Sequence, residues 1–246
     1  MRACSENLTA GVLAAVLIWA NPLACFAADV SAHTIVATGD GAVRARSDTN
    51  VVVWLTPVDP VATAAQSAQP ALPHATLLQK NKAFDPHILA VHVGSQVDFP
   101  NHEPFFHNVF SLFNGKRFDL GLYEAGSTRG VHFDRVGICY IFCNIHPQMS
   151  AVIVVVDTPY FAVSDSQGKV SIPHVPSGRY QVKVWEEHCD PDTLAKASRQ
   201  VAVGEEAMSL GDIRLQESNQ SGVAHSNKYG KAYDPDVYPG PIYVNP

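Results

Sequence analysis

The sequence lacks the motifs that mark several common enzyme and nucleic-acid-binding classes. It has no Gly-x-Ser-x-Gly nucleophile elbow, no glycine-rich phosphate loop and no His-Glu-x2-His zinc motif. Lysine and arginine total 17 against 23 acidic residues, which gives a net charge of −6. No basic stripe is present, so we expect no nucleic-acid partner.

Long helical patterns are also missing outside the N-terminus. The chain instead contains short alternating apolar runs, 17 prolines and 16 glycines, a composition that favours strands and turns. With 246 residues, 46% of them hydrophobic, it has enough material for two small cores. We therefore predict an all-β fold with two compact modules.

The N-terminus has the pattern of a secretory leader. A basic residue precedes the apolar run 11–20, and small residues follow up to Ala27, so residues 1–27 are predicted to be a cleaved signal peptide. Pro22 breaks the apolar run short of the roughly 20 residues that span a bilayer. The same proline argues against a lipoprotein attachment at Cys25. We expect export to a bacterial periplasm and no membrane span after cleavage.

The stretch 143–149 holds a thiol, an imidazole and a thioether, each three residues after the last: Cys143, His146 and Met149. A trigonal copper site takes one Cys and two His in the plane and a weakly bound Met above it. A second histidine is therefore needed. His107 is the best candidate, and His102 is its local rival.

These residues resemble the cupredoxins, the small blue copper proteins, through the segment His107-Asn108-Val109 and a Cys-x2-His-x2-Met loop spaced as in amicyanin. The resemblance covers roughly residues 76 to 157 and implies a Greek-key sandwich. It also implies one type 1 copper ion, with His107, Cys143 and His146 in the plane and Met149 on the axis. Asn108 would tie the two ligand loops together by hydrogen bonds. The whole chain further resembles bacterial plastocyanin-like methylamine utilisation proteins.

A second β pattern lies on both sides of this module. Asp-x2-Gly at 165–168 followed by Pro-Ser-Gly-Arg-Tyr at 176–180 resembles carboxypeptidase-regulatory, transthyretin-like β-sandwich modules. Such modules begin with a strand pair of the kind that residues 29–57 offer. We expect one sandwich built from residues 29–57 and 159–215, with the cupredoxin module, residues 75–158, inserted in it. Pairing of Val51–Leu55 with Tyr180–Trp185 would support this arrangement.

Two further segments connect or extend these modules. Residues 58–74 are rich in Ala, Pro and Gln and are predicted to be a linker. Residues 216–246 are polar and rich in Tyr and Pro, without apolar periodicity, and we expect a tail that is draped on the surface or disordered.

Cys139 lies four residues before Cys143 on an expected strand. At about 3.3 Å per residue the two thiols would be about 13 Å apart, too far for one metal ion or for a disulfide. Cys139 is then either a buried thiol or paired with Cys189.

The ligand set implies electron transfer, and we expect no enzyme activity. Four protein ligands leave no open position for a substrate. The His-Cys-His triplet of multicopper oxidases is absent, because Phe142 and Asn144 flank Cys143. Transient redox partner proteins would dock where Phe105, Phe106 and Pro147 surround the ligand loops. The alternatives are a copper carrier and a metal-free structural module.

Overall fold

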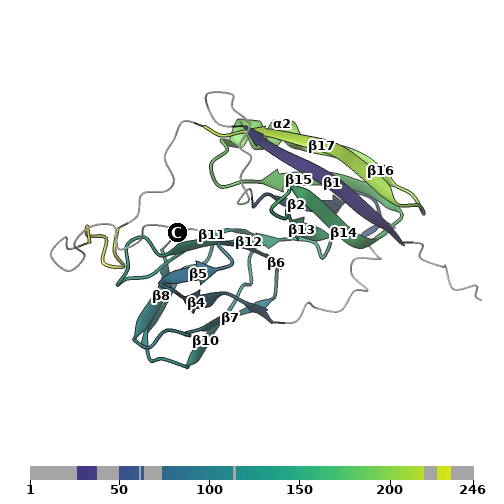
Figure 1. Ribbon diagram of the computed structural model, residues 1–246. Coiled ribbons are helices and arrows are strands. Elements are labelled where there is room, and N and C mark those ends of the chain that lie inside the picture. The colour runs from purple at the N-terminus through teal and green to yellow at the C-terminus, as the bar shows by residue number, and fades with distance from the viewer. Residues whose placement is uncertain are drawn as a thin grey trace, which may run out of the picture.

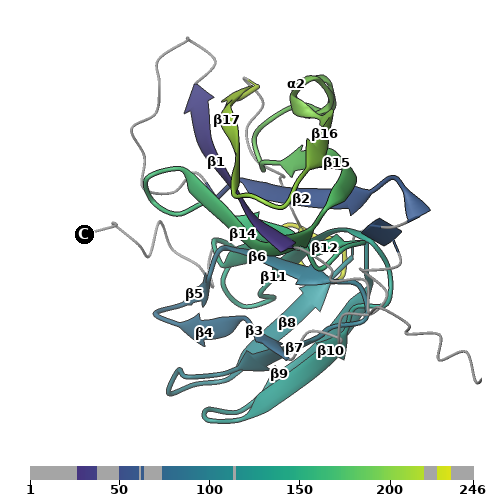
Figure 2. The same cartoon turned by 90° about the vertical axis from the view of Figure 1, so that its right-hand side faces the viewer.

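The computed structural model describes residues 27–37, 50–60, 62–63, 74–112, 115–218 and 226–233. Figure 1 shows two stacked β-sandwiches, and Figure 2 shows the same stack after a rotation of 90° about the vertical axis. The predicted leader, apart from Ala27, lies outside the described residues, as do most of the predicted linker and part of the tail. No helix in the described part of the chain is long and apolar enough to cross a membrane.

The first sandwich, here called the 75–156 sandwich, contains the stretch 143–149. Its larger sheet has the order β6 (Ile88–His92), β12 (Ser150–Val156), β11 (Gly137–Phe142), β8 (His107–Ser111) and β9 (Phe118–Tyr123). The opposing sheet is β10 (Thr128–His132), β7 (Gln96–Pro100) and β3 (Ala75–Thr76), with a small hairpin of β4 (Leu78–Lys80) and β5 (Ala83–Asp85) beside it. Fully buried side chains such as Phe99, Ile141 and Ile153 form the core between the sheets.

The second sandwich, here called the split sandwich, is built from two separate parts of the chain. One sheet is β14 (Lys169–Pro176), β1 (Ala27–Ala37) and β17 (Met208–Gln216), and the other is β13 (Phe161–Val163), β2 (Val52–Pro57), β15 (Gly178–Trp185) and β16 (Arg199–Val203). The short helix α2 (Pro191–Ala197) precedes β16. Strand β2 pairs with β15, with Leu55 opposite Val182, and also with β13. Segments before and after the 75–156 sandwich thus share one sheet.

A third apolar cluster joins the two sandwiches, and β12 shows how the sequence produces it. Successive side chains of a strand point to opposite faces. Ile153 and Val155 pack into the core of the 75–156 sandwich, whereas Val152 and Val154 pack against Val52 of β2 and its neighbours in the third cluster. Because both faces of β12 are covered, its sequence is a continuous apolar run with no polar alternation.

The all-β prediction is confirmed, since strands make up nearly all of the regular structure in the described residues. Strands β8 and β9 and helix α2 were not predicted. In β8 all five side chains are buried, so the strand shows no alternation. Helix α2 has only seven residues, begins at a proline and is capped by the Asp190 carboxylate. Cys139 and Cys189 are both free, so the alternative in which they form a disulfide is wrong. Cys139 is a buried thiol.

Candidate metal centre

The loop between β11 and β12 carries three of the predicted ligands. Cys143 directly follows β11, and Met149 directly precedes β12. Two backbone hydrogen bonds close the loop: the Cys143 N–H donates to the Met149 carbonyl at 3.1 Å, and the Met149 N–H donates to the His146 carbonyl at 3.0 Å. The loop is therefore a compact turn that fixes the spacing of its three side chains.

The fourth predicted ligand comes from the neighbouring strand. His107 is the first residue of β8, which pairs with β11 where Phe110 lies opposite Phe142. This pairing brings His107 beside Cys143, although 36 residues separate them. The rival residue, His102, is exposed and is not part of the cluster.

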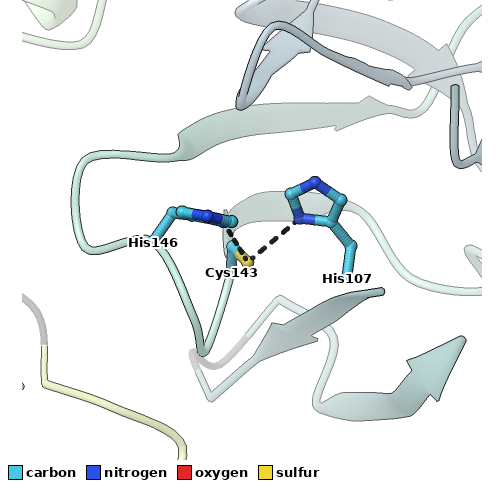
Figure 3. A group of neighbouring side chains, drawn as sticks. All are labelled: His107, Cys143 and His146. Carbon is cyan, nitrogen blue, oxygen red and sulfur yellow. Dashed lines mark hydrogen bonds between the residues drawn. The ribbon is translucent and has the colours of Figure 1, made fainter. Parts of the chain in front are cut away.

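The two imidazoles converge on the sulfur of Cys143, as Figure 3 shows. The Cys143 Sγ atom lies 3.5 Å from Nδ1 of His107 and 3.7 Å from Nδ1 of His146. One donor atom from each residue lies within 4.8 Å of the other two. The structure thus brings together all three predicted equatorial ligands.

Burial sets the protonation of these side chains. His107 and Cys143 are fully buried, and His146 is 9% exposed. Burial, followed by the effect of His146, lowers the pKa of His107 to about 4. Burial likewise lowers the pKa of His146 and raises the pKa of the Cys143 thiol. At neutral pH both imidazoles are uncharged, and each has one nitrogen lone pair available to a metal ion.

Backbone groups point at the Cys143 sulfur. The Ile145 N–H donates to Sγ at 3.4 Å, and backbone hydrogen bonds from His146 and Asn108 also favour the thiolate, although burial outweighs them in the pKa. Charged sulfur is favoured by such donors. They would stabilise a thiolate once its proton is lost.

Asn108 links two strands through its side chain. Its Nδ2 donates to a carboxylate oxygen of Asp119 on β9 at 2.6 Å. Its backbone N–H favours the thiolate form of Cys143. The described contact between Asn108 and the 143–149 loop is therefore made by the backbone.

The donor geometry fits a transition-metal ion. In a trigonal plane with metal–sulfur and metal–nitrogen bonds of about 2.3 and about 2.0 Å, the sulfur and each nitrogen lie about 3.7 Å apart. The two observed separations, 3.5 and 3.7 Å, are close to this value. One thiolate and two imidazoles form a donor set that suits copper.

Met149, the predicted axial ligand, is buried in the same core as Cys143. Its side chain is 1% exposed and belongs to the core of the 75–156 sandwich, together with Cys143 and Val109. The ring of Phe105 covers the imidazoles, with its centroid 5.2 Å from that of His107 and 5.8 Å from that of His146. These apolar neighbours keep water away from the donor atoms.

A second group of possible ligands lies in the split sandwich and comprises Glu186, His188 and Glu217. The His188 Nδ1 atom is 3.2 Å from a Glu186 carboxylate oxygen, and the hydrogen bond to Glu186 raises the pKa of His188. An imidazolium next to carboxylates accounts for this group, and we assign no metal to it.

Sequence reasoning did not find two residues that contact the ligand loop from a distant part of the chain, Lys228 and Tyr233. The hydroxyl of Tyr233 contacts Cys143. Lys228 contacts Asn144 through its backbone N–H and Asp119 through its ammonium. These partners lie 84 to 109 positions earlier in the chain. Lys228 and Tyr233 both lie in the segment that we expected to be draped or disordered. No local pattern of spacing or periodicity predicts contacts of this kind.

Comparisons with known proteins place cupredoxins among the structural neighbours. A purple cupredoxin from Nitrosopumilus maritimus matches at 22% identity over 33% of this chain and 99% of its own, with a TM-score of 0.31. Amicyanin, as a mutant in the reduced Cu(I) form, matches at 21% identity over 42% of this chain and 98% of its own, with a TM-score of 0.32. The Cu-containing nitrite reductase NirK from Thermus scotoductus SA-01 matches at 26% identity over 41% of this chain and 27% of its own, with a TM-score of 0.33.

Each of these likenesses covers less than half of this chain. No protein-family model matches the sequence. No curated protein matches it either. The resemblance to methylamine utilisation proteins therefore stays a prediction.

Proposed function

We propose that this protein binds one type 1 copper ion through His107, Cys143, His146 and Met149 and carries single electrons between redox partners in the periplasm. The observation that supports this most directly is the convergence of two imidazole Nδ1 atoms on one buried sulfur, at 3.5 and 3.7 Å. Copper held by this donor set can exchange one electron without a large change in ligand geometry.

The residues of the site favour electron transfer over catalysis. The side chains of His107, Cys143 and Met149 are almost completely buried, so the site has no room for a bound substrate beside four protein ligands. The two backbone hydrogen bonds of the 143–149 loop fix the spacing of the donors that it carries. A loop held in this way needs little rearrangement when a bound copper ion changes its charge by one.

The surface next to His146 suits a short-lived partner. Phe106 is 56% exposed, and Phe105 and Pro147 are half-buried around the ligand loops. A small apolar contact of this kind supports weak and transient association. We propose that redox partner proteins dock there, and that the predicted leader directs the chain to the periplasm.

The test is the visible absorption spectrum of the purified protein with one equivalent of Cu(II). We expect an intense thiolate-to-copper band that Cys143→Ser and His107→Ala both abolish. His102→Ala is the matched control, because His102 is an exposed histidine of the same segment, and this variant should keep the band.

The spectrum, together with redox cycling of the loaded protein and copper transfer to an acceptor, separates the alternatives. A colourless wild type would rule out the type 1 site and favour the metal-free structural module. A band that survives Cys143→Ser would mean that copper binds without this thiolate, which also rules out the type 1 site and favours the copper carrier. Copper that binds and passes to an acceptor protein, without reversible one-electron cycling, would favour the copper carrier.

A further inference from the structure

The segment 226–233 lies against the 143–149 loop, as the yellow part of Figure 1 shows. The hydroxyl of Tyr233 donates a hydrogen bond to the backbone carbonyl oxygen of Cys143 at 2.9 Å. The backbone N–H of Lys228 donates to the side-chain carbonyl of Asn144, also at 2.9 Å. Two neighbouring residues of the loop, one of them a predicted ligand, are thus held by the same segment.

A third contact reaches the other ligand strand. The Lys228 ammonium lies 2.9 Å from one carboxylate oxygen of Asp119, and the other oxygen accepts the hydrogen bond from Asn108. Asn108 directly follows His107 in β8. Lys228 therefore connects with both halves of the ligand set, through Asn144 on one side and through Asp119 and Asn108 on the other.

The segment has its own local structure. The side-chain oxygen of Asn227 accepts hydrogen bonds from the N–H groups of Tyr229 at 3.0 Å and Lys231 at 3.1 Å, and its backbone carbonyl accepts from Gly230 at 2.9 Å. Gly230 has a φ of 73°, a conformation that glycine adopts without strain. Such an Asn-based turn limits the conformational entropy that is lost when the segment packs on the loop.

We propose that segment 226–233 is a clamp, in which Lys228 and Tyr233 are positioning residues that hold Cys143 and its loop in the ligand geometry. The role as a metal clamp rests on the proposed function, whereas the restraint on the loop does not. With the clamp in place, Cys143 stays buried and directed at the two imidazoles. When the clamp is weakened, the loop opens more often.

The first test measures the reactivity of Cys143 in metal-free protein. Because Cys143 is fully buried, a thiol reagent such as 5,5′-dithiobis-(2-nitrobenzoic acid) reaches it only when the loop opens, and the rate reports that opening. We expect Tyr233→Phe to accelerate modification about three- to tenfold, which corresponds to the loss of one hydrogen bond. Lys228→Met should act in the same direction, and the double variant should exceed either single one.

Two controls make the result specific. Lys231→Met changes an exposed lysine of the same turn and should leave the rate unchanged. The same clamp variants in a Cys143→Ser background give the contribution of the other cysteines, which is subtracted. An unfolding midpoint equal to that of the wild type shows that faster modification is a local effect.

The second test uses protein loaded with copper. Tyr233→Phe should release copper to a chelator faster than Lys231→Met does, by a factor similar to that seen for the thiol. If Tyr233→Phe and Lys228→Met match the wild type in thiol modification, the clamp is refuted. If the wild type binds no copper, the proposed function fails, and the thiol rates still decide whether segment 226–233 restrains the loop.

Discussion

The imidazole Nε2 of His87 lies 2.7 Å from a carboxylate oxygen of Glu187, and this contact connects the two sandwiches. His87 directly precedes β6 of the 75–156 sandwich, and Glu187 follows β15 of the split sandwich. Next to it, the cluster that includes Val154 and Trp185 joins the same two units.

The His87–Glu187 pair should respond to pH. The hydrogen bond that the His87 imidazole donates to Glu187 is the main cause that raises the pKa of His87. A raised pKa means that the folded protein holds the proton more tightly. The contribution to stability is therefore complete below about pH 6.5, the ordinary value, and is lost as the pH rises through the raised pKa. Since the His87 side chain is 42% exposed, we expect less than about 1 kcal/mol.

The measurement is an NMR titration of the His87 imidazole in the wild type and in Glu187→Gln. Removal of the carboxylate charge should lower the pKa of His87. An identical titration in both proteins would show that the contact does not form in solution.

Met149→Leu tests the axial position of the metal centre. Met149 is 1% exposed, and Leu has nearly the same volume, so the fold should tolerate the change at a cost below about 1.5 kcal/mol. We expect the variant to keep copper and its absorption band but to shift the reduction potential, because the axial ligand tunes it. Spectroelectrochemistry measures the shift. Complete loss of copper binding, or an unchanged potential, would exclude the axial role.

Two neighbouring valines of β12 test whether both faces of this strand are buried. Val154 packs between the sandwiches and Val155 packs inside the 75–156 sandwich. We expect Val154→Ala and Val155→Ala each to lower the free energy of unfolding by about 1 to 3 kcal/mol, measured by denaturant titration. Val136→Ala is the control, since Val136 is 54% exposed and should change little. A Val154→Ala variant that behaves like this control would mean that the two sandwiches do not pack together.

Gly168 should not tolerate a side chain. Its φ is 76°, and a Cβ atom there would collide with the carbonyl oxygen of Thr34, whose N–H donates to the Gly168 carbonyl at 2.7 Å. The left-handed conformation alone costs a non-glycine residue about 1 to 2 kcal/mol. Gly168→Ala should therefore destabilise the protein by about 2 kcal/mol or more. Gly204→Ala, with open space around the site, is the matched control, and equal unfolding midpoints for the two variants would contradict this account.

The ligand loop could be predicted from sequence because its chemistry is local. Cys143, His146 and Met149 follow one another at a fixed spacing in one turn. His107 required a choice between two histidines, and the pairing of β8 with β11 explains why it, and not the exposed His102, reaches the sulfur. The all-β fold could be predicted from alternating apolar runs for a similar reason, because alternation is a property of each strand by itself.

The rest depends on contacts between distant parts of the chain. Strand β8 is buried on both faces, so its sequence, His-Asn-Val-Phe-Ser, has no alternation to recognise. The contacts of Lys228 and Tyr233 join a polar segment to a loop that precedes it by more than 80 residues. Neither feature has a periodic signature, since both are determined by tertiary packing.

The pairing of β2 with β13 has a consequence for how the two sandwiches depend on each other. Strand β2 ends at Pro57 and its partner β13 begins at Phe161, which lies opposite Trp54, so the whole 75–156 sandwich lies in the connection between two paired strands. Loop closure becomes only about 0.6 kcal/mol more costly with each doubling of loop length. The length of the insertion therefore adds little to the free-energy cost of pairing β2 with β13. A short turn in its place would keep the strands paired but would uncover Val52 and Trp185, so the insertion serves the split sandwich mainly as the cover of an apolar face.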